Sequence, residues 1–169
     1  MQYVSFATFA SNFNSMHLIV LIFHSFFRWL VLASLIFAIV RSFRGWMLKK
    51  QYSVLDNRIR HWTATIAHIQ LILGLWLYFI SPLISYFWHN YHVAAHQREI
   101  RFFSMEHSSM MLLSIIIITI GSAKAKRMKT DKGKYKIAAI TFSIALLIIL
   151  LSVPWPFSPM AGRPYFRIP

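Results

Sequence analysis

Residues 16–42 read MHLIVLIFHSFFRWLVLASLIFAIVRS, an apolar run longer than the roughly twenty residues that a helix needs to cross a bilayer. Three further runs of this kind follow, at 61–82, 102–123 and 135–153. None of the four shows the alternation of a strand, and continuous helices satisfy their own backbone in lipid. The sequence therefore predicts an all-α fold, a four-transmembrane-helix up-and-down bundle in which residues 1–169 form a single membrane domain.

The composition also indicates a membrane protein. The 169 residues are 57% hydrophobic, with eighteen basic and only four acidic residues, which is too little balanced charge for a soluble domain. The Lys and Arg residues lie in two blocks beside apolar runs, which favours anionic membrane lipid over nucleic acid as a partner. The chain has no cysteine. This excludes disulfides, thiolate metal sites, iron–sulfur clusters and covalently attached c-type haem.

The loops predict an orientation. Residues 41–60 carry six basic residues against Asp56, and residues 124–136 carry seven against Asp131. The positive-inside rule therefore places both loops in the cytoplasm and both termini outside. The segment 83–101 is rich in Tyr, Trp, Phe and His, which suits the outer membrane interface.

The two ends of the chain carry further signals. Residues 1–15 contain no basic residue and no apolar core, so they do not resemble a signal peptide, and translation could begin at Met1 or at Met16. The Pro-rich tail at 154–169 cannot continue a helix, because proline removes a donor and clashes with the preceding turn. We expect the tail to pack across the outer mouth of the bundle.

Five ionisable side chains lie in the interior of the apolar runs, away from their first and last two residues: His24, Arg28, His68, Glu106 and His107. A charge in a spanning helix costs on the order of 3 kcal/mol on insertion scales, so such groups normally face a cavity, a partner or a bound group. A single membrane histidine could simply hydrogen-bond a neighbouring helix. Three histidines together with an arginine and a glutamate favour a functional site.

Depth separates the three histidines. With a rise of about 1.5 Å per residue from the middle of each run, His24 lies roughly 6 Å and His107 roughly 8 Å toward the outside, whereas His68 lies roughly 5 Å toward the inside. His24 and His107 are therefore level, on helices that are diagonal in an up-and-down bundle, and two such imidazoles can ligate one haem iron. A His24–His68 pair stays open as an alternative. His68 could also be a second-site ligand, a proton relay or a quinone contact.

The neighbours of these histidines fit such a site. A buried guanidinium needs acceptors, so we expect Arg28 to pair with a haem propionate, a quinone oxygen or Glu106. Glu106 could instead reach the outer interface, and Trp29 is explained by packing alone. Small residues follow His107 at every seventh position, which leaves room for a flat ligand or for close helix approach. These small residues are Ser114 and Gly121.

The remaining histidines carry weaker signals. His61 lies beside Arg58 and Arg60 and is predicted to be interfacial. Three others have i, i+3, i+7 spacing, which permits a divalent metal, although an aromatic interfacial segment explains them without a ligand. These are His89, His92 and His96.

Five distinctive blocks of sequence follow one another along the chain. They are HSFFRW (24–29), HIQLILGLWLYFISP (68–82), RFFSMEHSSMM (101–111), ITIGSAKAKR (118–127) and VPWPF (153–157). Together they resemble a family of short bacterial four-helix membrane proteins known as cytochrome B or cytochrome b-like proteins. The resemblance implies a non-covalent b-type haem, a role in membrane electron transfer and a place in a bacterial inner (cytoplasmic) membrane, where the outer side of the bundle would be periplasmic. The family positions fall on His24, Arg28, Trp29, His68, Glu106 and His107. The fifteen residues before Met16, His61 and the histidines at 89–96 depart from the pattern.

Three functional hypotheses follow. In the leading one, the chain binds haem b and carries electrons between a membrane quinol and a partner subunit, so any enzymatic role would be that of a redox subunit. In the second, it is a cofactor-free accessory or assembly subunit whose histidines form interhelical hydrogen bonds. The third, a metal or proton transporter with a relay through His107, His24 and His68, is disfavoured by four short unbroken helices unless the chain oligomerises. Other membrane subunits or further copies of the chain are the expected protein partners.

Overall fold

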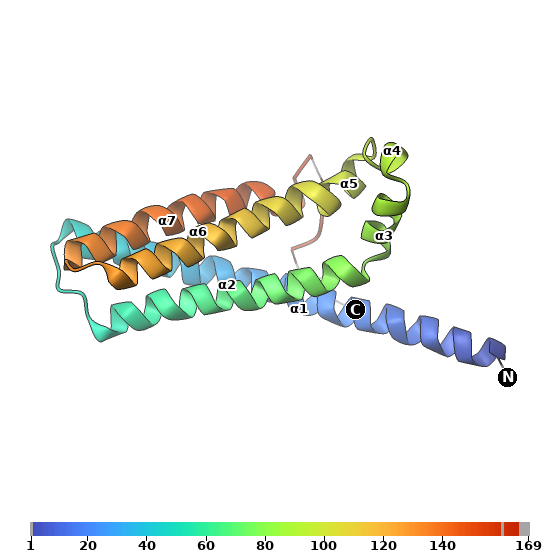
Figure 1. Cartoon of the computed structure of the whole chain (residues 1–169), viewed down its shortest axis with the longest axis horizontal. Helices are drawn as coiled ribbons and strands as arrows, with labels where there is room; N and C mark the ends of the chain where they lie inside the picture. The colour runs from blue at the N-terminus through green and yellow to red at the C-terminus, as the bar shows by residue number, and fades with distance from the viewer. Residues whose placement is uncertain (1, 160, 166–169) are drawn as a thin grey trace.

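Four long helices dominate the computed structural model, which describes residues 2–159 and 161–165, with side chains from Ser15 onward. Each of the four is long and apolar enough to cross a membrane (Figure 1). The long helices are α1 (Gln2–Met47), α2 (Val54–Ile80), α6 (Ser108–Arg127) and α7 (Asp131–Ser152). No strand occurs among the described residues. The prediction of an all-helical chain with four candidate membrane spans is therefore confirmed.

The helices extend beyond the apolar runs that predicted them. α1 starts well before residue 16, α2 begins at Val54 rather than at residue 61, and α7 begins at Asp131 rather than at residue 135. Hydropathy marks only the part of a helix that suits lipid, whereas the backbone hydrogen bonds continue into polar turns until a capping residue ends them. Of the two possible translation starts, Met16 lies within α1, and Met1 lies outside the described residues.

Capping residues set the tight turns at the loop end of the bundle. α1 closes with bonds from the Lys49 and Lys50 amides to the carbonyls of Trp46 (3.4 Å) and Gly45 (3.0 Å), the pattern of a Schellman motif. Lys49 accordingly adopts a left-handed φ of 50°. Ser53 then starts α2 through a capping box with Asp56, which satisfies orphan amides at the new helix start.

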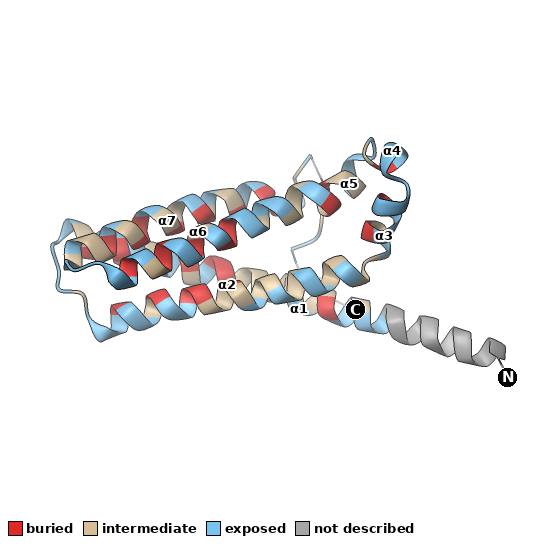
Figure 2. Ribbon diagram, in the orientation of Figure 1, coloured by how far each residue is buried: buried red, intermediate tan, exposed pale blue. Residues whose placement is uncertain are grey.

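The four long helices form a ring in which α1 packs against α2 and α7, and α6 packs against α7 and α2. α1 and α6 are therefore diagonal, as the sequence predicted for the helices that carry His24 and His107. The core lies between the four helices (Figure 2). Leu35, Ala67, Ile118 and Phe142, one from each helix, are fully buried at its centre.

Short elements and the C-terminal tail close one end of the bundle, which we call the mouth. The short elements form an arch from α2 to α6 (Figure 1). They are α3 (Pro82–His89), α4 (Tyr91–Ala94), α5 (Arg98–Arg101) and the π-helical η1 (Phe102–His107). The tail crosses this end as predicted: the Trp155 ring lies 6.1 Å from that of Trp29, and Arg163 forms an ion pair with Glu99. Residues 160 and 166–169 of the tail lie outside the described part of the chain. The opposite end, with the loops at 48–53 and 128–130, is the basic end.

Candidate functional site

His24 lies on α1 and faces α2. The side-chain amide nitrogen of Gln70 lies 3.4 Å from His24 Nε2 and donates a 3.0 Å hydrogen bond to the His24 carbonyl. One turn further along α2, Gly74 leaves room for the imidazole, since a Cβ at that position would lie 3.3 Å from His24 Cε1. His24 Nδ1 is buried and has no hydrogen-bond partner among the described residues. The ring is thus held in place while one of its nitrogens stays unsatisfied.

His107 is the last residue of η1 and faces α7. Its Nδ1 lies 2.8 Å from the Ser152 carbonyl oxygen. A carbonyl only accepts, so this nitrogen carries the proton and the lone pair of a neutral ring is on Nε2. The rings of Phe102 and Phe103 lie 5.9 Å and 6.2 Å from the imidazole. Bonds of this kind from the far nitrogen set the tautomer and orientation of histidines that ligate metals.

His24, His107 and Arg28 lie near one another toward the mouth, and we call these three residues the layer. His24 is on α1, and His107 directly precedes the diagonal helix α6. The charges of both His107 and Arg28 act on His24. Arg28 also acts on His107. The structure therefore brings together the two histidines that the depth estimate placed at one level, together with the arginine one turn from His24.

Arg28 is bound by the C-terminal tail. Its Nη2 donates a 2.6 Å hydrogen bond to the Tyr165 carbonyl, and Trp29 Nε1 donates to the same oxygen at 3.2 Å. The guanidinium carbon also lies 5.5 Å from the centroid of the Trp29 ring. Arg28 Nε remains buried without a partner among the described residues. The arginine therefore has donor capacity left for an acceptor that the described part of the chain does not provide.

Glu106 does not pair with Arg28, so that part of the prediction is wrong. Its carboxylate accepts a 2.8 Å bond from Arg101 Nε, and both side chains are about one-third exposed or more, at 32% and 41%. The physical reason is the π-helical register of η1, in which residues five apart come together. An α-helical reading of the sequence does not predict that contact.

His68 lies on the face of α2 that packs against α6, not on the face that contacts His24. Its Nε2 is 3.0 Å from Thr119 Oγ1 on α6, and the Thr119 hydroxyl donates to the Ile115 carbonyl at 2.7 Å. The imidazole must therefore donate from Nε2. His68 is two residues from Gln70, which turns it about 200° away from the face that contacts His24. The structure thus favours His24 with His107 over His24 with His68.

The small residues after His107 serve close packing. Ser114 is fully buried, and a Cβ at Gly121 would overlap the Thr141 side chain of α7. Of the two alternatives left open by the sequence, close approach of helices is the one that the described contacts support at Gly121. Four further histidines are exposed: His61, His89, His92 and His96. Within the described residues no group of three or more histidine or acidic side chains could hold a metal ion.

Several contacts of the site were not predicted from the sequence. Gln70 and Gly74 are four residues apart on the α2 face that meets His24, and this helical spacing could have singled them out. Ser152 and Tyr165 contribute backbone carbonyl oxygens. Every residue has such an oxygen, so residue type carries no signal for these two.

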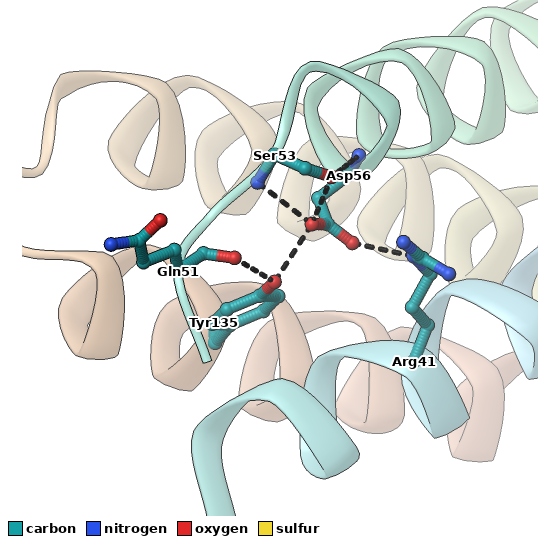
Figure 3. A network of polar contacts seen from close by, with 5 residues as sticks. All are labelled: Arg41, Gln51, Ser53, Asp56 and Tyr135. Carbon is teal, nitrogen blue, oxygen red and sulfur yellow. Dashed lines mark hydrogen bonds and ion pairs between the residues drawn. The ribbon is translucent and has the colours of Figure 1, made fainter. Parts of the chain in front are cut away.

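A second polar cluster closes the basic end (Figure 3). The Asp56 carboxylate accepts bonds from Arg41 Nε (2.5 Å), from the Ser53 amide (2.9 Å) and hydroxyl (2.6 Å), and from the Tyr135 hydroxyl (2.7 Å). Burial raises the pKa of Tyr52, whose ring packs at 4.9 Å against Tyr135. Asp56 is only 5% exposed. The cluster joins α1, the following loop, α2 and α7, and is well suited to a structural role.

Comparison of the chain with protein-family models, with curated proteins and with solved structures finds no match. The resemblance to cytochrome b-like proteins remains a hypothesis that rests on the sequence blocks. The functional argument below accordingly starts from the layer that contains His24, Arg28 and His107.

Proposed function

We propose that the chain is a membrane haem-b protein that carries electrons between a quinol and a partner subunit. The observation that carries the proposal is that His24 on α1 and His107 at the start of the diagonal helix α6 lie close enough, together with Arg28, for their charges to interact. Bundle cores hold cofactors between facing helices in this manner. The chain has no cysteine, so a thiolate ligand is excluded, and the two imidazoles are the side chains of this layer that can ligate iron.

One unsatisfied donor of the layer suits a haem propionate. Arg28 Nε is buried without a described partner, and such an atom costs about 1–3 kcal/mol unless something satisfies it. A propionate carboxylate would accept from this guanidinium. The Gln70 amide nitrogen can only donate toward His24 Nε2, so the lone pair of a neutral His24 ring is on Nε2, and iron would take that lone pair in place of the Gln70 amide.

Each residue of the layer has a distinct role in this proposal. His24 and His107 would hold the iron, and Arg28 would neutralise a propionate. A bound haem b would supply one-electron transfer. The Ser152 carbonyl keeps the His107 proton on Nδ1, which presents Nε2 and raises its basicity. The tail, through the Tyr165 carbonyl, orients Arg28 and covers the layer from the mouth side.

The proposal includes a place in the cell and partners. The basic loops at 41–60 and 124–136 support a bacterial inner-membrane protein with the mouth on the periplasmic side. The short loops contain no soluble catalytic domain. The electron acceptor would therefore be another membrane subunit or a second copy of the chain, and a membrane quinol would be the electron donor.

A reduced-minus-oxidised absorption spectrum of the purified full chain tests the proposal. We expect a b-type band in the unaltered protein, loss of the band in His24→Ala and His107→Ala, and its retention in the matched control His68→Ala. Added imidazole should restore the band to His107→Gly, which separates loss of a ligand from loss of the fold. A folded chain without stoichiometric haem would refute the proposal, and loss of the band in His68→Ala would refute the assignment of the ligands.

A cofactor-free accessory subunit is the second candidate, and one observation favours it. His107 and His68 both bond a neighbouring helix, through the Ser152 carbonyl and Thr119, which is the expected behaviour of a structural membrane histidine. Under this hypothesis, His107→Ala lowers bundle stability, and neither it nor the unaltered protein shows a chromophore.

A further inference from the structure

An open groove of about 210 Å³ lies between α2 and α6 toward the basic end. It is separate from the layer of His24 and His107, because its α2 side chains belong to the face that turns toward α6. Its polar lining includes Arg60, His68, Thr119 and Ser122, and its small side chains include Ala64 and Ala123. The groove therefore combines donors with a shallow surface that a chain of methylene groups could follow.

Arg60 is the unusual residue of this groove. It is 6% exposed, and its guanidinium binds neutral oxygen atoms: Nη1 donates to the Ser122 carbonyl at 3.0 Å and to the Ser122 hydroxyl, and Nη2 donates to Asn57 Oδ1 at 2.9 Å. Its Nε has no partner, and no carboxylate pairs with it among the described residues. A buried cation without a counter-ion is costly.

The nearest acidic side chain on α2 does not meet this need. Asp56, one turn before Arg60, lines a small cavity together with it and Tyr52. No ion pair joins Asp56 to Arg60 among the described residues, and the carboxylate is already shared by Arg41, Ser53 and Tyr135. The described residues that line the groove include no acidic side chain. Exposed cations lie on α2 and in the last turn of α6, the two helices that form the groove, and such clusters beside a membrane helix attract anionic lipid. They are Arg58, Lys124, Lys126 and Arg127.

We propose that this groove binds an anionic phospholipid, with the headgroup phosphate on Arg60 and an acyl chain along Ala64 and Ala123 toward His68. Arg60 and His68 are eight residues apart, about 12 Å along a helix, so the groove leads from the basic end toward the middle of the span. The phosphate supplies the charge that Arg60 lacks. This inference concerns a different face of α2 and does not depend on the binding of haem.

Native mass spectrometry of the full chain in a mild detergent tests the proposal. Phosphatidylglycerol and phosphatidylcholine are titrated separately, and adducts are counted for the unaltered chain and three variants. Arg60→Gln removes the buried charge. Ala123→Leu fills the groove without changing charge, so it keeps the test informative if Arg60→Gln folds poorly. Arg58→Gln is the matched control, because it removes an exposed charge from the same helix.

We expect one phosphatidylglycerol adduct to bind more tightly than phosphatidylcholine and to weaken by about tenfold or more in Arg60→Gln, since charge-assisted hydrogen bonds are lost. Ala123→Leu should weaken it similarly, whereas Arg58→Gln should change it by less than about threefold. Equal binding of the two lipids, or an unchanged adduct in Ala123→Leu, would overturn the proposal. Displacement of the adduct by millimolar inorganic phosphate, or by a short-chain quinone, would assign the groove to those ligands instead.

Discussion

The cluster around Asp56 allows a stability prediction with a magnitude that follows from its contacts. Tyr135→Phe removes one hydroxyl, which lies 2.7 Å from Asp56 Oδ2 and 3.1 Å from the Gln51 carbonyl. The phenyl ring keeps its packing at 4.9 Å from Tyr52, so little besides the hydrogen bond is lost. A hydrogen bond to a charged group contributes about 1.5–3 kcal/mol. We therefore expect Tyr135→Phe to lower the free energy of unfolding by about 2 kcal/mol.

Asp56→Asn should cost more, about 3–5 kcal/mol. Its amide nitrogen must face donors on Arg41, Ser53 or Tyr135, and Arg41 loses its counter-ion. The order of the two variants distinguishes a network centred on the carboxylate from a set of independent contacts.

Equilibrium unfolding in mixed micelles, with increasing mole fractions of a denaturing detergent and helicity as the signal, measures both variants. Tyr86→Phe is the matched control, since it removes a hydroxyl from an exposed ring and should change stability by less than about 0.5 kcal/mol. If Tyr135→Phe behaved like Tyr86→Phe, or cost more than Asp56→Asn, the argument from this network would be refuted.

Three further predictions follow from the mouth and the helix contacts. Arg28→Gln should loosen the tail, because the 2.6 Å bond to the Tyr165 carbonyl is weakened. Limited chymotrypsin digestion should then cleave after Tyr165 several-fold faster, and an unchanged rate would count against this anchor. Glu106→Gln breaks a partly exposed ion pair and should lower the free energy of unfolding by less than about 1 kcal/mol in the same assay. It should leave any haem absorption band unchanged, and loss of the band would show that Glu106 belongs to the cofactor site. Gly121→Val introduces a Cβ that overlaps Thr141 and should destabilise the bundle by about 3 kcal/mol, whereas an unaltered melting temperature would show that α6 and α7 can separate there.

The number of spans and the diagonal placement of α1 and α6 could be predicted from the sequence. Hydropathy is summed along a continuous run, so four apolar runs specify four helices whatever their neighbours are. With short connections, sequential helices become neighbours, which places the first and third across from each other. The depth estimate for His24 and His107 needed only the rise per residue. These features depend on local composition and on chain connectivity.

The partners of the polar groups could not be predicted in the same way. The packing of α2 against α1 places Gln70 beside His24 and turns His68 toward Thr119. The π-helical register of η1 decides that Glu106 meets Arg101. Both outcomes depend on side-chain packing between elements, and a pattern read along one element contains no information on its neighbours.

The sequence by itself thus determined a helical membrane chain with costly ionisable groups in its spans, because the cost of charge in lipid depends on residue type and position along the run. Only the tertiary structure decided how those groups divide: His24, Arg28 and His107 in one layer, His68 in a groove with Arg60, and Glu106 in an ion pair at the mouth. The bond from Arg28 to the Tyr165 carbonyl joins residues 137 positions apart. Such a contact forms only when the folded bundle brings distant segments together. Residue type does not indicate which backbone oxygen accepts, because every residue has one.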